Sequence, residues 1–167
     1  MPELPEVETV RRGLAELVVG RPIVRVEVGR ERSVRRTSRE AVIAGLTGTT
    51  MLEARRRGKY LVCDLDSGDA VMVHLRMSGQ LLVAPAATPR PPHTHVTMIL
   101  GDGSDELRFV DPRTFGEVVV FDPDRAAEQV PELGRLGVDR QRAVVMAHAD
   151  RPFRHFDPEL RARHRRL

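Results

Sequence analysis

The stretch MLEARRRGKYLVCDLDSGDAVMVHLRMSGQLLVA, residues 51–84, decides the fold of this 167-residue chain. Its apolar runs are short and are separated by residues typical of turns: Arg57-Gly58, Asp66-Ser67-Gly68 and Ser78-Gly79. Short strands at this spacing predict an antiparallel sandwich or barrel. We expect the strands of this stretch near residues 51–52, 60–65, 70–75 and 81–84.

The flanking sequence extends this β-rich body and adds helices to it. Val24, Val26 and Val28 alternate with charged residues, which predicts a half-buried strand. Further strands are expected at about 94–100, 106–110 and 116–121, after a Pro-rich loop at 84–93. An apolar stripe at helical spacing predicts an amphipathic helix over 5–19, and Ser38 can cap a short helix that ends at Ala44.

The composition excludes several classes of protein. With 41% hydrophobic and 31% charged residues, the chain is apolar enough for one globular domain and too apolar to be disordered. No apolar run approaches the roughly 20 residues that span a bilayer, and the acidic start MPELPEVET is unlike a secretory signal. We therefore expect a cytoplasmic protein with no membrane partner. Its single cysteine, Cys63, lies in an apolar run and is expected to be a buried core thiol.

The basic residues are almost all arginine, and many of them lie near the C-terminal end of the sequence. Of the 27 Lys and Arg residues only Lys59 is a lysine, so the chain offers two aliphatic amines, its N-terminus and Lys59. Residues 151–167 hold six arginines against Asp157 and Glu159. Arginine matches phosphate geometry, which favours a nucleic-acid partner, although a solvated charged helix fits the same charges equally well.

The N-terminus is the most informative chemical feature. Met1 precedes Pro2, and removal of Met1 leaves a proline with a free secondary amine. An α-amine has a pKa of about 7.7–8.0 against about 10.4 for lysine, so more of it is nucleophilic at neutral pH. Its attack on a sugar aldehyde carbon gives a cationic iminium that favours elimination at the neighbouring carbon. Glu3 and Glu6 can supply the acid, although Pro and Glu are also ordinary at the start of a helix.

Several motifs of this sequence resemble those of bacterial formamidopyrimidine-DNA glycosylase, in the same order and at similar spacing. They are MPELPEVETVRRGL at 1–14, RRRGKYL at 55–61, HLRMSGQL at 74–81, HTHV at 93–96 and DPRTFG at 111–116. The resemblance covers residues 1 to about 121. It implies a mainly β fold, a two-layer antiparallel β-sandwich with flanking helices, one of them N-terminal, followed by the start of a helical DNA-binding domain.

The resemblance also implies a function: a bifunctional DNA glycosylase/AP lyase of base excision repair, which removes oxidised purines (8-oxoguanine, formamidopyrimidines) through a Schiff base. Pro2 would be the nucleophile at C1′ and Glu3 the general acid. Glu6 would organise charge near the nucleophile, and Lys59 would donate a proton during β-elimination and touch phosphate. Without the resemblance, Lys59 next to Gly58 is a solvated hairpin lysine.

The same resemblance assigns contacts with DNA. Met77, Arg113 and Phe115 would fill the gap left by the flipped nucleotide, and His74 and His93 would contact phosphates. From the residues alone, Met77 also fits a core, Arg113 a surface turn and Phe115 a core aromatic. Their turn-rich surroundings favour exposure, because turns project side chains outward.

No metal or other cofactor is expected in this chain. His93 and His95 are spaced to share one side of a strand, but no third ligand or cysteine pair accompanies them. Full-length members of the family carry one structural zinc in a C-terminal finger with four cysteines, which has no counterpart in this sequence.

We expect an N-terminal catalytic domain at 1–135, and at 136–167 a hinge and the beginning of a truncated helix-two-turns-helix domain. Residues 137–151 depart from the usual Leu-Gly-Pro-Glu pattern of the family, and the chain is expected to end inside the first helix of that second domain. Half of the DNA clamp would then be missing, which predicts weak or absent excision with residual AP-lyase activity. The expected partner is double-stranded DNA containing an oxidised base or an abasic site, bound by a monomer.

Three other interpretations stay open. An endonuclease VIII-like glycosylase for oxidised pyrimidines shares Pro2 and Glu3, but that branch typically opens with Pro-Glu-Gly-Pro-Glu, so Leu4 and the DPRTFG motif favour the purine branch. A truncated, non-catalytic DNA-binding remnant fits an early end of the chain. A generic arginine-rich RNA binder explains the basic end but neither the N-terminus nor the lone Lys59.

Overall fold

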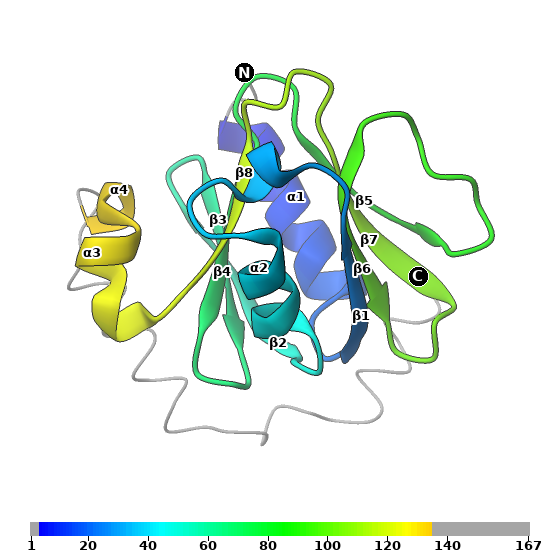
Figure 1. Cartoon of the computed structure of the whole chain (residues 1–167), viewed down its shortest axis with the longest axis horizontal. Helices are drawn as coiled ribbons and strands as arrows, with labels where there is room; N and C mark the ends of the chain where they lie inside the picture. The colour runs from blue at the N-terminus through cyan, green and yellow to red at the C-terminus, as the bar shows by residue number, and fades with distance from the viewer. Residues whose placement is uncertain (1–3, 135–167) are drawn as a thin grey trace.

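The computed structural model describes residues 4–134; residues 1–3 and 135–167 lie outside the described part. Two four-stranded antiparallel sheets make up its body (Figure 1). One sheet has the order β1 (Ile23–Val28), β6 (Thr94–Leu100), β7 (Asp105–Val110) and β5 (Gln80–Pro85). The other has the order β2 (Met51–Arg57), β3 (Tyr60–Leu65), β4 (Ala70–His74) and β8 (Glu117–Phe121). The predicted two-layer antiparallel sandwich is confirmed.

Helices flank the sandwich. α1 (Leu4–Leu17) packs against β2 and β3, whereas α2 (Arg39–Leu46) packs against β1 of one sheet and β8 of the other. The 3-10 turn η1 (Glu31–Val34) precedes α2 and contacts β8. After β8 the chain forms η2 (Pro123–Arg125), α3 (Ala126–Gln129) and α4 (Pro131–Gly134). In residues 4–134, no helix combines the length and the apolar character needed to cross a membrane.

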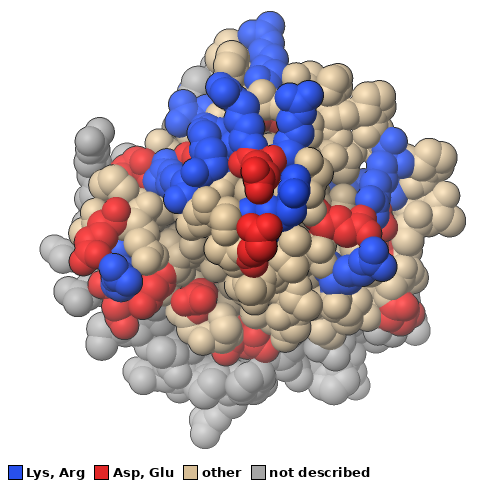
Figure 2. Space-filling view, in the orientation of Figure 1, with Lys and Arg blue, Asp and Glu red and all other residues tan. Residues whose placement is uncertain are grey.

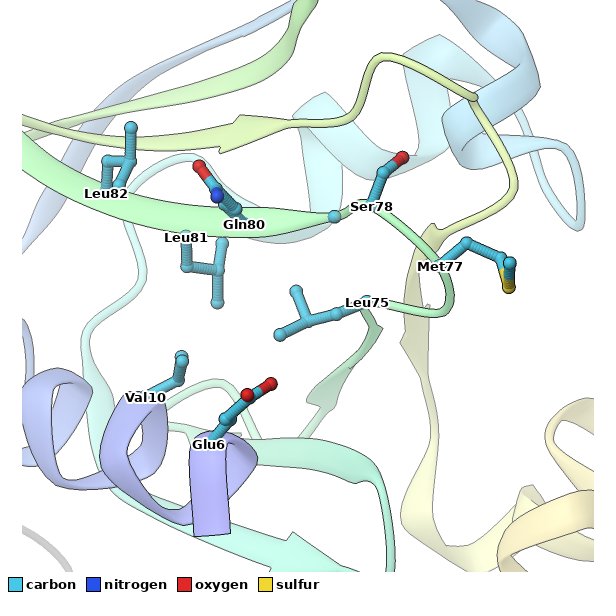
Figure 3. Close-up of a pocket in the computed structure, with 9 residues that line it drawn as sticks. Glu6, Val10, Leu75, Met77, Ser78, Gln80, Leu81 and Leu82 are labelled. Atoms are coloured by element: carbon cyan, nitrogen blue, oxygen red, sulfur yellow. The ribbon is translucent and has the colours of Figure 1, made fainter. Parts of the chain in front are cut away.

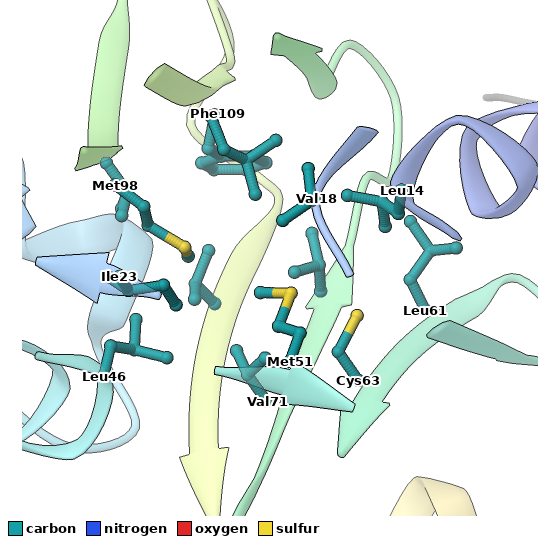
Figure 4. Packing of buried hydrophobic residues seen from close by; sticks show 14 of the residues in the cluster. Leu14, Val18, Ile23, Leu46, Met51, Leu61, Cys63, Val71, Met98 and Phe109 are labelled. Carbon is teal, nitrogen blue, oxygen red and sulfur yellow. The ribbon is translucent and has the colours of Figure 1, made fainter. Parts of the chain in front are cut away.

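The main hydrophobic core fills the space between the sheets, because alternate residues of each strand face inward. Buried side chains from both sheets, α1 and α2 meet there (Figure 4): Leu14, Val18, Ile23, Leu46, Met51, Leu61, Val71, Met98 and Phe109. Cys63 belongs to the same core and is 2% exposed. Burial, together with the charge of Asp64, raises the pKa of the Cys63 thiol to about 12. The prediction of a buried core thiol is confirmed.

A second, smaller core covers the other face of the sheet that contains β3, β4 and β8. Side chains of that sheet meet those of α3 and α4: Val62, Ala70, Met72, Val119, Phe121, Ala126, Val130 and Leu133. Arg36 fastens the same end of the described chain. Its guanidinium donates to the Gln129 carbonyl and to the carboxylates of Glu117 and Glu132. Both apolar packing and ion pairs therefore attach α3 and α4 to the sheet.

The predicted helices are found with shifted ends. α1 spans Leu4–Leu17 instead of 5–19. α2 begins after Ser38, whose side chain accepts a hydrogen bond of 3.0 Å from the Ala41 amide, and it continues to Leu46, past the expected end at Ala44. The Ser38 cap itself is confirmed.

β2 is longer than the strand expected near 51–52, since it continues to Arg57. Its arginines are compatible with a packed sheet because they have acidic partners: Arg55 pairs with Asp64 on the neighbouring strand. The predicted division into domains at 1–135 and 136–167 falls at the edge of the described residues and stays a prediction.

Candidate functional site

Two loops cross from one sheet to the other and meet at one end of the sandwich. The Met77 loop, residues 75–79, joins β4 to β5, and the Phe115 loop, residues 111–116, joins β7 to β8. Met77 is 48% and Phe115 43% exposed, and Arg113 is exposed as well. The three residues predicted to enter DNA thus lie on adjacent loops, and neither Met77 nor Phe115 is a core residue.

Asp111 and Ser78 tie the two loops together. Asp111 is completely buried, and its carboxylate accepts hydrogen bonds from the Ser78 hydroxyl (2.6 Å) and from the Gly116 amide (2.8 Å). The Ser78 oxygen in turn accepts a bond of 3.2 Å from the Arg113 amide. One buried carboxylate therefore contacts both loops.

Glycine is required where these loops approach their neighbours. A Cβ atom at Gly79 would lie 2.5 Å from the Leu75 carbonyl oxygen, and one at Gly116 would lie 2.6 Å from the His74 carbonyl oxygen. Both distances are far below van der Waals contact. A larger residue at either position would displace a loop.

Among residues 4–134, the non-glycine residues with left-handed backbone are all at this end of the molecule. They are Arg76 in the Met77 loop (φ 51°), Thr114 in the Phe115 loop (φ 55°) and His93 (φ 67°), whose carbonyl accepts a bond from the Asp111 amide (3.0 Å). This conformation is uncommon for residues with a β-carbon, so surrounding contacts must hold it. Strained backbone of this kind concentrates at functional sites.

Arginines from η1 and just after it also hold the Phe115 loop. Arg32 donates to the Thr114 carbonyl (3.1 Å), and Arg35 donates to the carbonyls of Phe115 (3.0 Å) and Gly116 (3.1 Å). Both arginines are exposed, and Figure 2 shows basic side chains gathered on the upper part of this face, around the place of η1. A basic surface beside the two loop tips favours binding of a polyanion.

His74 lies at the end of β4, where the Met77 loop begins. Its neighbours on adjacent strands are Glu117 and Tyr60, whose ring centroid is 4.2 Å from that of His74. Only 6% of His74 is exposed, and burial, together with the charge of Arg76, lowers its pKa to about 4. The ring is therefore neutral at physiological pH and can donate one hydrogen bond to phosphate without adding charge. Its contact with DNA stays a prediction.

His93 and His95 have different surroundings. His93 is exposed and precedes β6, whereas His95 is buried in β6, where its Nε2 atom bonds the Asp111 carbonyl (2.8 Å). His93 lies outside the strand with left-handed backbone, so the two residues do not share a strand face, but their ring centroids are 6.3 Å apart in an edge-to-face arrangement. Over the described range, no group of three or more His, Cys, Asp or Glu side chains is arranged to hold a metal ion.

Lys59 occupies the turn of the β2–β3 hairpin, as expected. Gly58 takes a positive φ (59°), and the strands pair up to Arg57 and Tyr60. Lys59 is partly exposed, and the following residue, Tyr60, packs on His74. The lysine is therefore carried by a tight hairpin whose turn end adjoins the start of the Met77 loop.

A pocket of about 490 Å³ opens between α1 and the Met77 loop. Glu6 reaches into it from the first turn of α1 toward Leu75, while Met77, on its rim, points away (Figure 3). Pro2 and Glu3, the predicted nucleophile and general acid, lie outside the described residues. Their roles, like that of Glu6, stay predictions.

Charged contacts with β2 fix the position of α1. The Glu8 carboxylate bonds Arg11 within the helix (2.9 Å) and Arg56 on β2 (3.3 Å), and Arg11 also donates to the Ala54 carbonyl (3.3 Å). The Arg11 guanidinium, helped by Arg56, lowers the pKa of Glu8 to about 2, so the carboxylate stays ionised. These contacts hold the helix whose first turn brings Glu6 to the pocket.

Sequence reasoning missed the residues that hold the loops in place, Asp111 and Ser78, and also Arg108. Arg108 is 1% exposed, pairs with Glu106 (3.0 Å) and donates to the carbonyls of Pro85 at the end of β5 and of Thr88 and Pro89 just after it. The available signal was weak: two opposite charges on the same face of one strand.

Known proteins share this architecture and sequence. Residues 1–118 match the family described as the formamidopyrimidine-DNA glycosylase N-terminal domain. Formamidopyrimidine-DNA glycosylase of Salinispora arenicola is 56% identical over 141 residues, which cover 83% of this chain and 48% of the relative. The protein of the same name from Thermosynechococcus vestitus is 48% identical over 138 residues, which cover 81% of this chain and 48% of the relative. The chain spans about half the length of the curated relatives it matches.

Solved structures agree with the sequence comparison. A crystal structure of Lactococcus lactis Fpg with DNA containing an abasic site aligns with a TM-score of 0.72 at 36% identity, covering 80% of this chain and 48% of that one. The Lactococcus lactis protein bound to DNA containing FAPY-dG aligns with a TM-score of 0.71, with the same identity and coverage. The chain belongs to the formamidopyrimidine-DNA glycosylase family, and residues 1–118 match its N-terminal domain.

Proposed function

We propose that this chain is the catalytic N-terminal part of a bifunctional DNA glycosylase/AP lyase that acts on oxidised purines in double-stranded DNA. The observation that carries the proposal is the convergence of the exposed Met77, Arg113 and Phe115 with the pocket beside Glu6 at one end of the sandwich. Relatives named formamidopyrimidine-DNA glycosylase, and solved relatives that hold abasic or FAPY-dG DNA, support it.

The proposed chemistry begins at Pro2. Its secondary amine attacks C1′ of the damaged nucleotide and loses its proton, and the bond from C1′ to the base breaks as the leaving base takes up a proton. The bond from C1′ to the sugar ring oxygen then breaks as that oxygen is protonated, which opens the sugar and leaves a cationic iminium between the proline nitrogen and C1′. Glu3 supplies a proton to the sugar ring oxygen or the leaving base. The cationic iminium then allows loss of a proton from C2′ and breakage of the bond from C3′ to the phosphate oxygen. Lys59 donates a proton in this elimination. An amine and carboxylic acids suffice, so the proposal assigns no cofactor to this chain.

The loops supply the DNA contacts in this proposal. Flipping a nucleotide out of the duplex costs a few kcal/mol and leaves a gap in the stack. Met77 fills that gap, Phe115 wedges the neighbouring bases apart, and Arg113 donates hydrogen bonds to the unpaired cytosine. His74 and His93 contact the flanking phosphates. The exposure of the loop tips and the strained backbone beneath them support this assignment.

A borohydride-trapping assay with a duplex containing an abasic site tests the chemistry, because borohydride reduces the iminium and fixes the protein to DNA. Lys59 is the only lysine of the chain, so Lys59→Arg leaves the N-terminal amine as the only aliphatic amine. We expect an adduct with the wild type and with Lys59→Arg, and none with a product whose intact mass shows that Met1 is retained. An adduct that requires Lys59 contradicts the assignment to Pro2, and DNA binding with no adduct supports the non-catalytic remnant.

Lesion preference is tested by comparing excision from duplexes containing 8-oxoguanine and thymine glycol. We expect faster excision of the purine, and the reverse result would support the endonuclease VIII-like interpretation. Both lesions need measurement, since Lactococcus lactis Fpg has been solved with DNA containing an oxidised pyrimidine. We also propose that the protein acts as a monomer in the cytoplasm. Sedimentation of the DNA complex tests the oligomeric state.

A further inference from the structure

The hydrogen bond between Ser78 and Asp111 joins two loops whose contacting residues are 33 positions apart in the sequence. Each loop is a crossover between the sheets, and each carries part of the group that enters DNA in the proposed function. We propose that this pair is a lock that holds the two loops as one rigid unit, so that Met77 on one loop and Arg113 and Phe115 on the other enter DNA together. The entry into DNA rests on the proposed function, whereas the lock itself rests on the geometry of the loops.

Both oxygens of the Asp111 carboxylate take part in the lock. Oδ1 accepts from the Ser78 hydroxyl (2.6 Å), and Oδ2 accepts from the Gly116 amide (2.8 Å). Ser78 makes a second contact with the Phe115 loop, because its oxygen accepts a hydrogen bond from the Arg113 amide (3.2 Å). Asp111 has no exposed surface, so water does not compete for these bonds, and hydrogen bonds to a buried carboxylate are stronger than bonds between neutral groups.

Asp111 is also anchored from below. Its amide donates to the His93 carbonyl (3.0 Å), and its carbonyl oxygen contacts Nε2 of the buried His95 (2.8 Å). The backbone of Asp111 is therefore held by β6 and by His93, which precedes that strand, before any DNA is bound. A fixed acceptor is what allows one loop to dictate the position of the other.

The strained backbone of both loops needs support, and the lock provides it. Arg76 and Thr114, one in each loop, have left-handed conformations that residues with a β-carbon rarely adopt without support. Arg76 lies two residues before Ser78, and Thr114 directly follows Arg113, so both are next to lock contacts. Loss of the Ser78 hydroxyl should therefore loosen the backbone of the Phe115 loop, although the substitution lies in the Met77 loop.

Hydrogen exchange of segment 111–117 tests the lock without DNA. Ser78→Ala removes the hydroxyl, Ser78→Thr keeps it, and Ser67→Ala is the matched control, because the Ser67 oxygen also accepts one backbone hydrogen bond (3.3 Å) but lies in the β3–β4 turn. We expect Ser78→Ala to accelerate exchange of the Arg113 and Gly116 amides by about tenfold or more, the effect of losing a hydrogen bond to a charged group. Ser78→Thr and Ser67→Ala should exchange like the wild type.

Asp111→Asn provides a second variant in the other loop. The Asn oxygen can still accept from the Gly116 amide, but its NH2 group then faces Ser78 and must donate to the Ser78 oxygen, so the Ser78 bond is reversed and both bonds lose the negative charge that strengthens them. We expect it to accelerate exchange in the Met77 loop, residues 75–79, as well as in its own. Wild-type exchange in the opposite loop of both Ser78→Ala and Asp111→Asn overturns the lock.

The DNA part is tested with a duplex that carries a stable abasic analogue opposite cytosine and 2-aminopurine beside it, whose fluorescence rises when its neighbours unstack. We expect Ser78→Ala to lower the preference for this duplex over an intact one by roughly tenfold and to reduce the fluorescence change. Ser78→Thr restores both quantities, and Ser67→Ala keeps them.

The hydrogen-exchange and DNA-binding experiments distinguish failure of the lock from failure of the proposed function. A wild-type chain that neither prefers the abasic duplex nor gives a borohydride adduct refutes the proposed function and with it the DNA role of the lock, while hydrogen exchange still decides whether the lock exists. Faster exchange in Ser78→Ala with an unchanged preference for the abasic duplex overturns the DNA role alone.

Discussion

His74 couples the stability of the protein to pH through one buried ring. Burial is the main reason why its pKa falls from the ordinary 6.5 to about 4 in the folded protein. Between these values the unfolded chain binds the proton more readily than the folded one. The contribution of His74 to the free energy of unfolding is thus complete above about pH 6.5 and is lost as the pH falls toward about 4.

We expect this group to remove up to about 3 kcal/mol from the free energy of unfolding between about pH 7 and pH 4.5. His74→Asn should lose less stability than the wild type over the same interval, because it has no ring to protonate. Urea unfolding at the two pH values measures the difference, with His93→Asn, at an exposed histidine, as the control. Identical pH dependence in the wild type and His74→Asn would contradict the prediction.

The Cys63 thiol should not react while the protein is folded. Burial raises the pKa of its thiol to about 12, and the thiolate is the form that reacts. Labelling with a thiol reagent at about pH 8 should proceed only at the rate of unfolding, and should become fast in urea. Complete labelling of the folded protein within seconds would show that the thiol is accessible.

At the scale of single residues, local sequence predicts exposure better than it predicts partners. The turn residues around Met77 and Phe115 suffice to place their side chains outward, and their roles come from the resemblance to a known family. Ser78 and Asp111 could not be found in this way, because each acquires its importance from a partner 33 residues away. Pro2 and Glu3 rest on the sequence alone.

Loops and helices respond differently to the same substitution. A Cβ atom at Gly79 would lie 2.5 Å from the Leu75 carbonyl oxygen, whereas one at Gly13, inside α1, would have no neighbour within 4 Å. Gly79→Ala should destabilise the protein by about 1–3 kcal/mol through displacement of the Met77 loop. Gly13→Ala should stabilise it by about 1 kcal/mol, because alanine is the better helix former.

Thermal or urea unfolding of the two variants measures both effects. Since the chemical change is the same, Gly13→Ala is the control for any general effect of an added methyl group. A Gly79→Ala protein as stable as the wild type would mean that the loop has room that the structure does not show.

At the scale of elements, strands bounded by turn residues were predictable, and arginine-rich segments were not. The alternation and the turns locate β3, β4, β6 and β7 closely. The second half of β2 is a run of arginines, and η1 begins with the charged pair Glu31-Arg32, so no period indicates a buried face in either. Their side chains are accommodated by distant partners, such as Asp64 for Arg55 and Glu8 for Arg56.

Arg36 connects parts of the whole molecule that are far apart in the chain. It pairs with Glu117 on β8, which is 2% exposed, and with Glu132 on α4. Arg36→Met should destabilise the protein by about 3 kcal/mol, because a buried carboxylate loses a close partner, and should speed hydrogen exchange in residues 123–134. Arg125→Met, which breaks the exposed pair with Glu128, should cost less than about 1 kcal/mol.

Urea unfolding combined with hydrogen exchange distinguishes the two variants. Equal losses of stability in Arg36→Met and Arg125→Met would contradict the view that Arg36 fastens α3 and α4 to the sheet. A loss of stability without faster exchange in 123–134 would confine the role of Arg36 to β8.

At the scale of the molecule, the two-layer architecture was predictable but the order of strands was not. The sequence pattern left a sandwich and a barrel open, and only the resemblance chose between them. The pairing of β5 with β7 and of β4 with β8 joins strands that are not consecutive, so it depends on how the loops cross between sheets. The division expected after residue 135 lies outside the described residues and stays a prediction.

Because both loops cross between the sheets, side chains of the hydrophobic core lie directly beneath them. Phe109, 1% exposed in the core, would come within 3.0 Å of a Cβ atom at Gly116, directly beneath the Phe115 loop. The bulk of such interior side chains sets the spacing of the two layers, and with it the relative height of the two protruding tips. In the proposed function, a conservative exchange in the hydrophobic core would therefore change which lesions the protein accepts, and directed evolution of substrate range should include core residues as well as surface residues.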